Sequence, residues 1–412
     1  MFMENYRPEI SFARDALSVC GPDAAVEHGQ VIAHYKLRCT SEQVGAIASA
    51  LCFEHTVELS PSLIGAGYLA TEIAGRTGDV SQIDATTFAC EIRYPAAAAS
   101  GGLTTLLTLV MGNAGFFPEV ELTGLDLPES LQKAFLGPKF GIEGLRQNLG
   151  RLEGPITGTA LKPLGASATE LAAIAGQMAE GGIEILKEDD GISTQAYAPF
   201  AERVARCSAA VREAADRSNN TCLYFPNITG PQETLIDRAM FAQDAGAGGV
   251  ELLPGPMGLD SVRMLAELPD LKIPVAVHSA WTGGMCRPPN PALSYAVAFG
   301  LLPRLAGADI SIMPGFGGRF GLPKNACRET ADILGSPIGG TSSTLPMVGG
   351  GLTFDRIDEY VSLYGNDVIL LISGALFEAD GTLIENCREF VRRTRLATRN
   401  LKYATGDSRR EG

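Results

Sequence analysis

The stretch ITGTALKPLGASATELAAIAGQMAEGGIEILKEDD, residues 156–190, decides the fold class. Ile156–Pro163 and Ile183–Asp189 are apolar runs that end in polar residues, as buried strands do. Between them, Ala168–Glu180 repeats its apolar residues at helical spacing. A strand, a helix and a second strand in about 35 residues predict one unit of an alternating parallel β/α fold.

The same alternation continues to the end of the chain. Eight strand-and-helix units in about 250 residues are typical of a TIM (β/α)8 barrel, and few other folds use eight. The predicted strands are Ile156–Pro163, Ile183–Asp189, Cys222–Asn227, Gly249–Pro254, Ile273–Ser279, Asp309–Pro314, Thr344–Gly349 and Val368–Ser373. The predicted helices are Ala168–Glu180, Phe200–Ala215, Gln232–Ala245, Ser261–Glu267, Pro291–Leu305, Lys324–Leu334, Phe354–Leu363 and Leu383–Leu396.

The chain before residue 150 mixes strands and helices less regularly. Strands are predicted at 31–39, 85–94 and 120–127, and helices at 41–54 and 103–111. This βαββαβ-like order predicts a small α+β domain of the ferredoxin-like type. The expected division is therefore 1–148 for the α+β domain and 149–412 for the TIM barrel with its C-terminal tail.

The composition excludes several classes of function. The chain has 33 Lys and Arg against 47 Asp and Glu, a net charge of −14, so nucleic-acid and anionic-membrane partners are not expected. The opening MFMENYRPEI lacks the regions of a signal peptide, and the longest apolar run is broken by glycine and asparagine. Nine scattered cysteines without a CxxC pair fit a reducing cytoplasm. Four histidines without paired spacing argue against a zinc hydrolase.

Polar side chains gather where the predicted barrel strands end. In a TIM barrel the active site forms at the carboxyl ends of the strands, so these residues are expected to meet at one rim. They are Thr159 and Lys162 on the first strand, Lys187, Asp189 and Asp190 on the second, Asn227 on the third, His278 on the fifth, and Arg319 in the loop after the sixth. A purely structural barrel would not need them.

Lys187, Asp189 and Asp190 form the densest group. Lys187 and Asp189 lie two residues apart on a strand, so both are expected to point into the barrel mouth. Buried carboxylates at this density require a cation, and oxygen ligands favour Mg²⁺, or else Ca²⁺ or Mn²⁺, over zinc. A structural salt bridge from Lys187 explains the spacing equally well. Lys162 would share the pocket, and two close ammonium groups lower each other's pKa, as a catalytic lysine requires.

Three further features fit substrate binding. Gly349–Gly351 and Ser373–Gly374 follow the last two strands, where TIM barrels commonly hold a phosphate, although turns alone would also use these glycines. GFGGRF (315–320) is typical of a mobile lid with Arg319 near its tip, or of a plain exposed loop. A lone histidine is more often a packing residue, but the position of His278 at a strand end favours a functional role.

Three motifs carry a family resemblance. GTALKPLGAS (158–167), GGIEILKEDD (181–190) and KFGI (139–142) resemble the ribulose-bisphosphate carboxylase (RuBisCO) large-chain superfamily over nearly the whole chain. The resemblance implies that Lys187, carbamylated by CO₂, binds one Mg²⁺ with Asp189 and Asp190, and that Lys162 handles protons at the substrate carbon. It places His278 in the active site and Asn227 beside the metal. It also implies a homodimer in which Glu54 and Asn113 reach the partner subunit's active site; no small subunit is inferred.

The departures from the family pattern narrow the chemistry. The second lysine of the family's KPK motif is Leu164, the arginine after the strand-five histidine is Ser279, the strand-six histidine is Ile312, and the strand-seven serine is Gly349. The loss of the arginine, the histidine and the serine around one phosphate site implies a substrate with a single phosphate. The loop lysine that stabilises the incoming carboxylate is Arg319, so a RuBisCO-like (form IV) protein without CO₂ fixation is expected.

The expected function is Mg²⁺-dependent formation of an enediolate from a phosphorylated ketose or 3-oxo sugar acid. Arg319, which could hold a departing carboxylate, favours a decarboxylase of a 3-oxo sugar-acid phosphate. The alternatives are an isomerase of 5-methylthioribulose 1-phosphate and an enolase of the diketo analogue. The enolases use a lysine of the N-terminal domain as base, and none lies between Phe88 and Leu131. A catalytically silent sugar-phosphate sensor is the alternative from another class.

Overall fold

The computed structural model describes residues 29–405, which divide into two units. The first unit runs to Ala134 and takes in a later segment, Cys286–Ser294. The second unit consists of Phe135–Met285 and the chain from Tyr295 onward. Helix α5 (Gly141–Leu149) therefore belongs to the second unit, where its Leu145 and Leu149 pack into the core.

A four-stranded antiparallel sheet forms the centre of the first unit. Its strands stand in the order β2-β3-β1-β4, with β1 in an inner position. The bounds are β1 Gln30–Arg38, β2 Arg76–Asp84, β3 Thr87–Pro95 and β4 Val120–Asp126, with helices α1 Val44–Glu54, α2 Pro61–Ile64, α3 Leu103–Met111 and α4 Glu129–Gln132 and short turns Leu69–Ile73, Ala96–Ala99 and Asn113–Phe116. The chain order β1-α1-β2-β3-α3-β4 confirms the predicted α+β domain.

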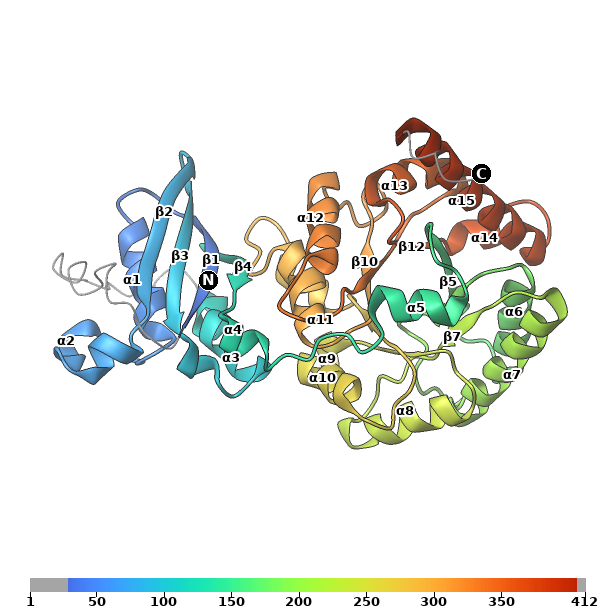
Figure 1. Cartoon of the computed structure of the whole chain (residues 1–412), viewed down its shortest axis with the longest axis horizontal. Coiled ribbons are helices and arrows are strands. Elements are labelled where there is room, and N and C mark those ends of the chain that lie inside the picture. The colour runs from blue at the N-terminus through green and yellow to red at the C-terminus, as the bar shows by residue number, and fades with distance from the viewer. Residues whose placement is uncertain (1–28, 406–412) are drawn as a thin grey trace, which may run out of the picture. The chain divides into compact units, whose positions relative to one another are not determined.

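The sequence did not reveal strand β2. Its sequence RTGDVSQID has no run of alternating apolar side chains, and its residues from Asp79 to Asp84 are exposed. It is an edge strand held to β3 by backbone pairing, for example between Thr77 and Ile92 (Figure 1). Because burial of side chains creates the period-two pattern, an edge strand without burial leaves no such pattern.

Eight parallel strands form the barrel of the second unit. All eight predicted strands are present, including β11, and the strand order β7-β6-β5-β12-β11-β10-β9-β8 closes where Asn227 pairs with Glu251. The strands are β5 Ile156–Leu161, β6 Ile185–Glu188, β7 Leu223–Phe225, β8 Val250–Leu252, β9 Val275–His278, β10 Ile310–Pro314, β11 Leu345–Gly349 and β12 Ile369–Leu371. This confirms the TIM barrel.

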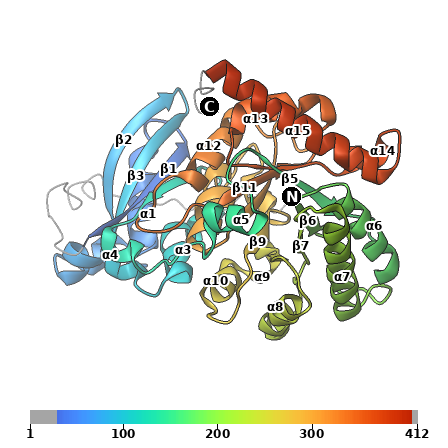
Figure 2. The same cartoon turned by 45° about the vertical axis from the view of Figure 1, so that its right-hand side comes forward.

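Helices surround the barrel, as Figures 1 and 2 show for α6, α7 and α8. The long helices are α6 Ala168–Glu180, α7 Phe200–Ser218, α8 Leu235–Asp244, α10 Leu259–Glu267, α12 Lys324–Gly335, α13 Ile357–Tyr364 and α15 Leu383–Thr405, and the short ones are α9 Pro254–Met257, α11 Leu302–Leu305 and α14 Gly374–Glu378. Short 3₁₀-helical segments lie at Gln232–Thr234, Thr282–Cys286 and Phe354–Arg356, and a π-helical segment lies at Ala296–Leu301. Within residues 29–405, no helix combines the length and the hydropathy that crossing a bilayer requires.

One predicted helix, Pro291–Leu305, begins later than the pattern indicated. Its first residues are extended and pair with β4 in the first unit: the Leu122 N–H donates to the carbonyl of Ala292 at 2.9 Å, and the Ser294 N–H donates to Leu122 at 3.0 Å. Helical structure starts only at Ala296. Pairing with a strand distant in sequence overrides the local helical spacing.

The barrel core explains the position of α5. Leu145 and Leu149 pack with inward residues of the strands, among them Ile156 and Ile310. The buried carboxylate of Asp309 accepts hydrogen bonds from the N–H groups of Phe140 (2.7 Å), Gly141 (2.8 Å) and Val275 (2.9 Å). Burial raises the pKa of Asp309 to about 6. The carboxylate of Asp309 thus holds the start of α5 against the amino ends of β9 and β10.

Candidate active site

A cavity of about 600 Å³ lies at the carboxyl ends of the barrel strands. This is the end at which TIM barrels place their active sites, and the volume suits a small metabolite. Eleven of the predicted site residues line it: Lys162, Lys187, Asp189, Asp190, His278, Arg319, Gly349, Gly350, Gly351, Ser373 and Gly374. The expected convergence of strand ends therefore occurs within this unit.

Asp189 lies between the two lysines. Its Oδ2 is 2.6 Å from the Nζ of Lys162, and its Oδ1 is 4.0 Å from the Nζ of Lys187. Lys187 is only 1% exposed, whereas Lys162 and Asp189 keep about a third of their side chains accessible. Two amines of different burial thus share one carboxylate, which is suited to moving protons at the cavity wall.

Glu251 on β8 is part of this cluster, and the sequence analysis missed it. It is fully buried, its Oε1 lies 3.3 Å from the Nζ of Lys187, and its Oε2 has no partner among residues 29–405. Burial raises its pKa to about 8, although the Lys187 ammonium opposes that rise. A single acidic residue inside the apolar strand GGVELLP was the available signal.

His278 enters the cavity as a neutral ring. Burial, with Lys187 and Lys162 nearby, holds its pKa well below the ordinary value. Its Nδ1 lies 3.1 Å from the backbone nitrogen of Ala280 and accepts that N–H. The proton of the neutral ring is therefore on Nε2, so His278 can donate a hydrogen bond to a substrate oxygen without carrying charge.

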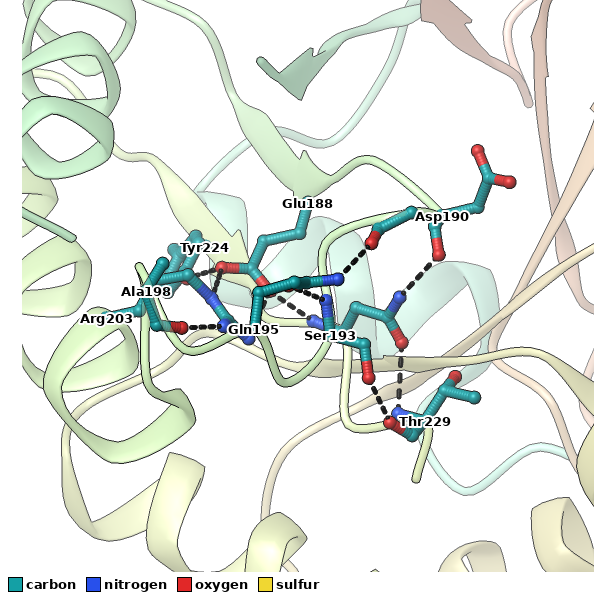
Figure 3. Close-up of polar contacts among 10 residues, drawn as sticks. Glu188, Asp190, Ser193, Gln195, Ala198, Arg203, Tyr224 and Thr229 are labelled. Atoms are coloured by element: carbon teal, nitrogen blue, oxygen red, sulfur yellow. Dashed lines mark hydrogen bonds and ion pairs between the residues drawn. The ribbon is translucent and has the colours of Figure 1, made fainter. Parts of the chain in front are cut away.

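Glu188 faces away from the cavity, since it alternates along the chain with Lys187 and Asp189, which line it. Its carboxylate accepts from Arg203 at 2.7 and 3.1 Å, from the Tyr224 hydroxyl at 2.6 Å and from the backbone N–H of Asn227 at 2.9 Å. Figure 3 shows this group on the helix side of β6. The two carboxylate oxygens are fully engaged, so the group fixes β6 against α7 and the end of β7.

Asn227 links that group to the loop that carries Asp190. Its Nδ2 donates to the backbone carbonyl of Asp190 at 3.1 Å, and its Oδ1 accepts from the N–H of Thr229 at 3.0 Å. In Figure 3 the Asp190 carboxylate points away from this network. Asn227 itself is buried and is not among the described residues that line the cavity, and neither is Thr159, whose buried hydroxyl has no partner among the described residues.

The loop that carries Arg319 packs on the glycines after β11. The Arg319 N–H donates to the carbonyl of Gly350 at 3.1 Å, and a side chain at Gly318 would collide with the same carbonyl. Gly351 has a φ of +132°, which only glycine adopts readily. The exposed Arg319 guanidinium lies over the Phe320 ring, 4.7 Å from its centroid, at the cavity edge.

Glu54 and Asn113 come together within the first unit. The Asn113 Nδ2 donates to the Oε1 of Glu54 at 2.6 Å. The neighbouring His55 accepts the N–H of Ala114 at 3.1 Å, which fixes the start of the turn Asn113–Phe116 against the end of α1. The two residues that the resemblance assigned to a partner's site therefore form one polar pair.

The oxygen donors of the cavity fit a divalent cation only in part. Asp189 and Asp190 supply carboxylates to the same cavity, but residues 29–405 contain no group of three His, Cys, Asp or Glu side chains placed to hold a metal ion. A hard cation such as Mg²⁺ prefers more than two oxygen ligands from protein and substrate together. A carbamate on Lys187 would add the missing anionic oxygen beside Asp189, so the set fits Mg²⁺ once Lys187 carries it.

Comparison with known proteins gives the family. The family profile described as ribulose bisphosphate carboxylase large chain, catalytic domain, matches residues 141–319. Ribulose bisphosphate carboxylase-like protein 1 of Rhodopseudomonas palustris is 34% identical over 361 residues, which are 88% of this chain and 96% of that protein. The chain belongs to the RuBisCO large-chain family.

Two further similarities place it among the RuBisCO-like members. The 5-methylthioribulose-1-phosphate isomerase of Rhodospirillum rubrum is 32% identical over 87% of this chain and 94% of that enzyme. The crystal structure of a RuBisCO-like protein from Rhodopseudomonas palustris superposes with a TM-score of 0.79 and 31% identity, covering 89% of this chain and 97% of the other.

Proposed function

We propose that this RuBisCO-family protein is an Mg²⁺-dependent enzyme that removes a proton next to the carbonyl of a singly phosphorylated ketose and so forms an enediolate. The observation that carries the proposal is the position of Asp189 between Lys162 and Lys187 at the cavity wall. The named activity of the Rhodospirillum rubrum relative, isomerisation of 5-methylthioribulose 1-phosphate, supports a ketose monophosphate as the substrate class.

Asp189, Asp190 and a carbamate on Lys187 would hold the metal ion. When bound, Mg²⁺ polarises the substrate carbonyl and stabilises negative charge on its oxygen. Glu251 suits a carbamate, because a carboxyl group whose pKa is raised to about 8 is mostly protonated at pH 7 and can donate a hydrogen bond to it. The same Glu251 accepts from Lys187 while Lys187 is an ammonium group.

Lys162 and His278 would handle the protons. Lys162 is bonded to Asp189 at 2.6 Å and is the more accessible of the two amines, so as a free amine it can reach a substrate C–H. His278, neutral with its proton on Nε2, would donate a hydrogen bond to the developing oxyanion. Lys162 is thus the base in this proposal, and His278 is the hydrogen-bond donor.

The cavity wall favours one phosphate group. Gly349–Gly351 and Ser373–Gly374 line the cavity after β11 and β12, and glycines at such a position let a phosphate approach the backbone closely. Ser279 and Ile312, which stand where the family has an arginine and a histidine at a second phosphate site, line the cavity without supplying a cation. A second phosphate would have no counter-charge there, so a monophosphate is expected.

Decarboxylation of a 3-oxo sugar-acid phosphate is the second candidate, and Arg319 favours it. Loss of CO₂ from such an acid leads to the same enolate, and the exposed guanidinium at the cavity edge could bind the leaving carboxylate bidentately. The Arg319→Gln variant separates the two functions: a decarboxylase should lose most of its activity, whereas enolisation of a ketose monophosphate should change little.

Deuterium exchange tests the proposal. Protein supplied with Mg²⁺ and bicarbonate in D₂O should incorporate solvent deuterium into at least one ketose monophosphate, and Lys162→Met should abolish the exchange. Release of ¹³CO₂ from carboxyl-labelled 3-oxo acid phosphates identifies the second candidate. Tight binding of a ketose monophosphate without exchange or release would instead indicate the non-catalytic sensor.

We also propose a homodimer with shared active sites, in which the polar pair Glu54–Asn113 serves the partner's cavity. Mixing the inactive variants Glu54→Gln and Lys162→Met tests it. If sites are shared, mixed dimers contain one site with both wild-type residues and regain about a quarter of the activity on statistical mixing. If each chain is complete by itself, mixing restores nothing.

A further inference from the structure

A second cavity, of about 430 Å³, lies at the opposite end of the barrel from the candidate active site. Its walls include Gly182, which precedes β6, and Asn220, which precedes β7, so it opens at the amino ends of these parallel strands. Four arginines of the last helix, α15, line it: Arg388, Arg392, Arg395 and Arg399.

The spacing of these arginines places them in one row. They follow one another at intervals of four, three and four residues, so they lie on a single face of α15 over about 16 Å of helix. Cys387 and Phe390 are fully buried and hold another face of α15 against the barrel. The row is therefore fixed to a packed helix rather than to a loop.

Two glycines make the hollow below the row. A side chain at Gly181 would collide with Cys387, so this glycine lets α15 approach the turn between α6 and β6. Gly182 follows with a φ of +90°, a conformation that suits glycine. Because neither residue has a side chain, the space beneath the arginines stays open, with the side chain of Asn220 close to Gly182.

Two acidic residues lie near this row: Glu389 pairs with Arg392 of the row itself, and Glu180, which lines the hollow, pairs with Arg217 outside it. Glu389 accepts from Arg392 at 2.7 and 2.8 Å, and Glu180 lies 3.4 Å from Arg217. No hydrogen bond or ion pair between residues of the described chain engages the side chains of Arg395 and Arg399. On a protein of net charge −14, several exposed guanidinium groups around one hollow form a local positive field.

We propose that this arginine pocket binds a small polyphosphate anion, that is, a molecule with two or more linked phosphate groups. Guanidinium groups bind phosphate oxygens bidentately, and a row of several needs a longer anion than one phosphate. The volume suits a ligand of nucleotide size. The site is separate from the active-site cavity, where a single phosphate is expected, so its ligand is an effector rather than the substrate.

Calorimetric titration of the full-length protein with inorganic tripolyphosphate, and in parallel with ATP, tests this site. One anion should bind per chain, with affinity that falls as salt rises. The double variant Arg395→Ala/Arg399→Ala should weaken binding at least about tenfold, since charged hydrogen bonds are lost. Arg319→Ala, at the other end of the barrel, should leave binding unchanged.

The matched control is Arg206→Ala/Arg328→Ala, which removes two exposed arginines with the same change in net charge. Equal weakening in both double variants, or no saturable binding by the wild type, would overturn the proposal. So would an Arg395→Ala/Arg399→Ala protein that binds the anions normally but melts at a lower temperature, because the arginines would then only offset the carboxyl ends of α6 and α7. None of these outcomes bears on enolisation.

Discussion

The two faces of strand β6 treat buried charge in opposite ways. On the outer face, Glu188 and Arg203 form a two-pronged ion pair, and Tyr224 and Asn227 complete the carboxylate's hydrogen bonds. On the inner face, one residue earlier in the chain, Lys187 lies 3.3 Å from a Glu251 whose second oxygen has no partner in the described chain. Both faces are buried, so they differ in whether every oxygen of the buried carboxylate has a hydrogen-bond partner.

This difference distinguishes a buried ion pair that stabilises the fold from buried groups that can take part in a reaction. A buried charge whose hydrogen bonds are all made is held in one state and stabilises one geometry. A buried charge with an unsatisfied neighbour can change state, by protonation, modification or binding of an ion, at little cost. The inner face is therefore where the reaction is expected, and the outer face is what keeps the inner one in place.

Lys187→Met should give the largest effect. The inner face would lose both its amine and the carbamate proposed on it, so deuterium exchange into a ketose monophosphate should fall by about 10⁴-fold or more. Because Glu251 can be neutralised by protonation, the variant should still fold, which a thermal melt checks. A Lys187→Met protein that keeps its activity would contradict the proposal that the inner face of β6 carries out the reaction.

Arg203→Met should act on stability instead. Removing one partner of a buried ion pair leaves Glu188 charged and uncompensated, which costs about 3–5 kcal/mol of unfolding free energy. The loss is measured by urea denaturation. Under conditions where the variant is folded, its activity per folded molecule should stay within about tenfold of wild type. A stable but inactive variant would contradict the division of roles.

Glu251→Gln should change how the free energy of unfolding depends on pH. Burial raises the pKa of Glu251 to about 8, above its ordinary value of 4.5, so the folded state binds the proton more tightly than the unfolded state. The stability that this group contributes is complete below pH 4.5 and is lost as pH rises through 8. At about 1.4 kcal/mol per pKa unit, the wild type should lose a few kcal/mol relative to Glu251→Gln across this window.

The measurement uses urea denaturation at pH 5 and pH 8, with chelator and without CO₂, so that Lys187 remains an amine. Glu188→Gln serves as the comparison on the outer face. Parallel stability curves for the wild type and Glu251→Gln between these two pH values would show that Glu251 is not held in its protonated form.

Arg206→Ala should have the smallest effect. Arg206 lies on α7, three residues from Arg203, and pairs with Glu202 at 2.8 Å, but about half of each side chain is exposed. Exposed pairs of this kind contribute about 0.3–0.5 kcal/mol. A loss of more than about 1 kcal/mol of unfolding free energy would show that burial is not what makes the Arg203 pair contribute more than the Arg206 pair.

Much of the fold could be predicted because burial in a barrel leaves a regular signal. Every barrel strand lies between two layers, so each is an apolar run, and all eight were found. Strand β2 was missed because its side chains are exposed, and residues 291–294 were assigned to a helix because their partner, Leu122, lies far away in sequence. Local patterns do not report pairing with distant residues.

The site residues differ in the same way: those that depend on local position were predicted, and the one that depends on a distant contact was not. Lys162, Lys187, Asp189 and His278 were predicted because position at a strand end is visible in the sequence, and all four line the cavity. Glu251 was missed because it lies in the middle of its strand and its closeness to Lys187 depends on β6 and β8 both being neighbours of β7 in the closed barrel. Asn227 was predicted at a strand end, beside the metal, and its buried amide donates to the backbone of the loop that carries Asp190.

We propose that the buried polar groups on the inner face of β6 are all satisfied only when a carbamate and a cation are present. Calorimetric titration with Mg²⁺, with and without bicarbonate, measures this most directly. We expect one Mg²⁺ per chain, bound only when bicarbonate is present and not bound by Lys187→Met. Binding that ignores bicarbonate and survives Lys187→Met, or no binding under either condition, would contradict it.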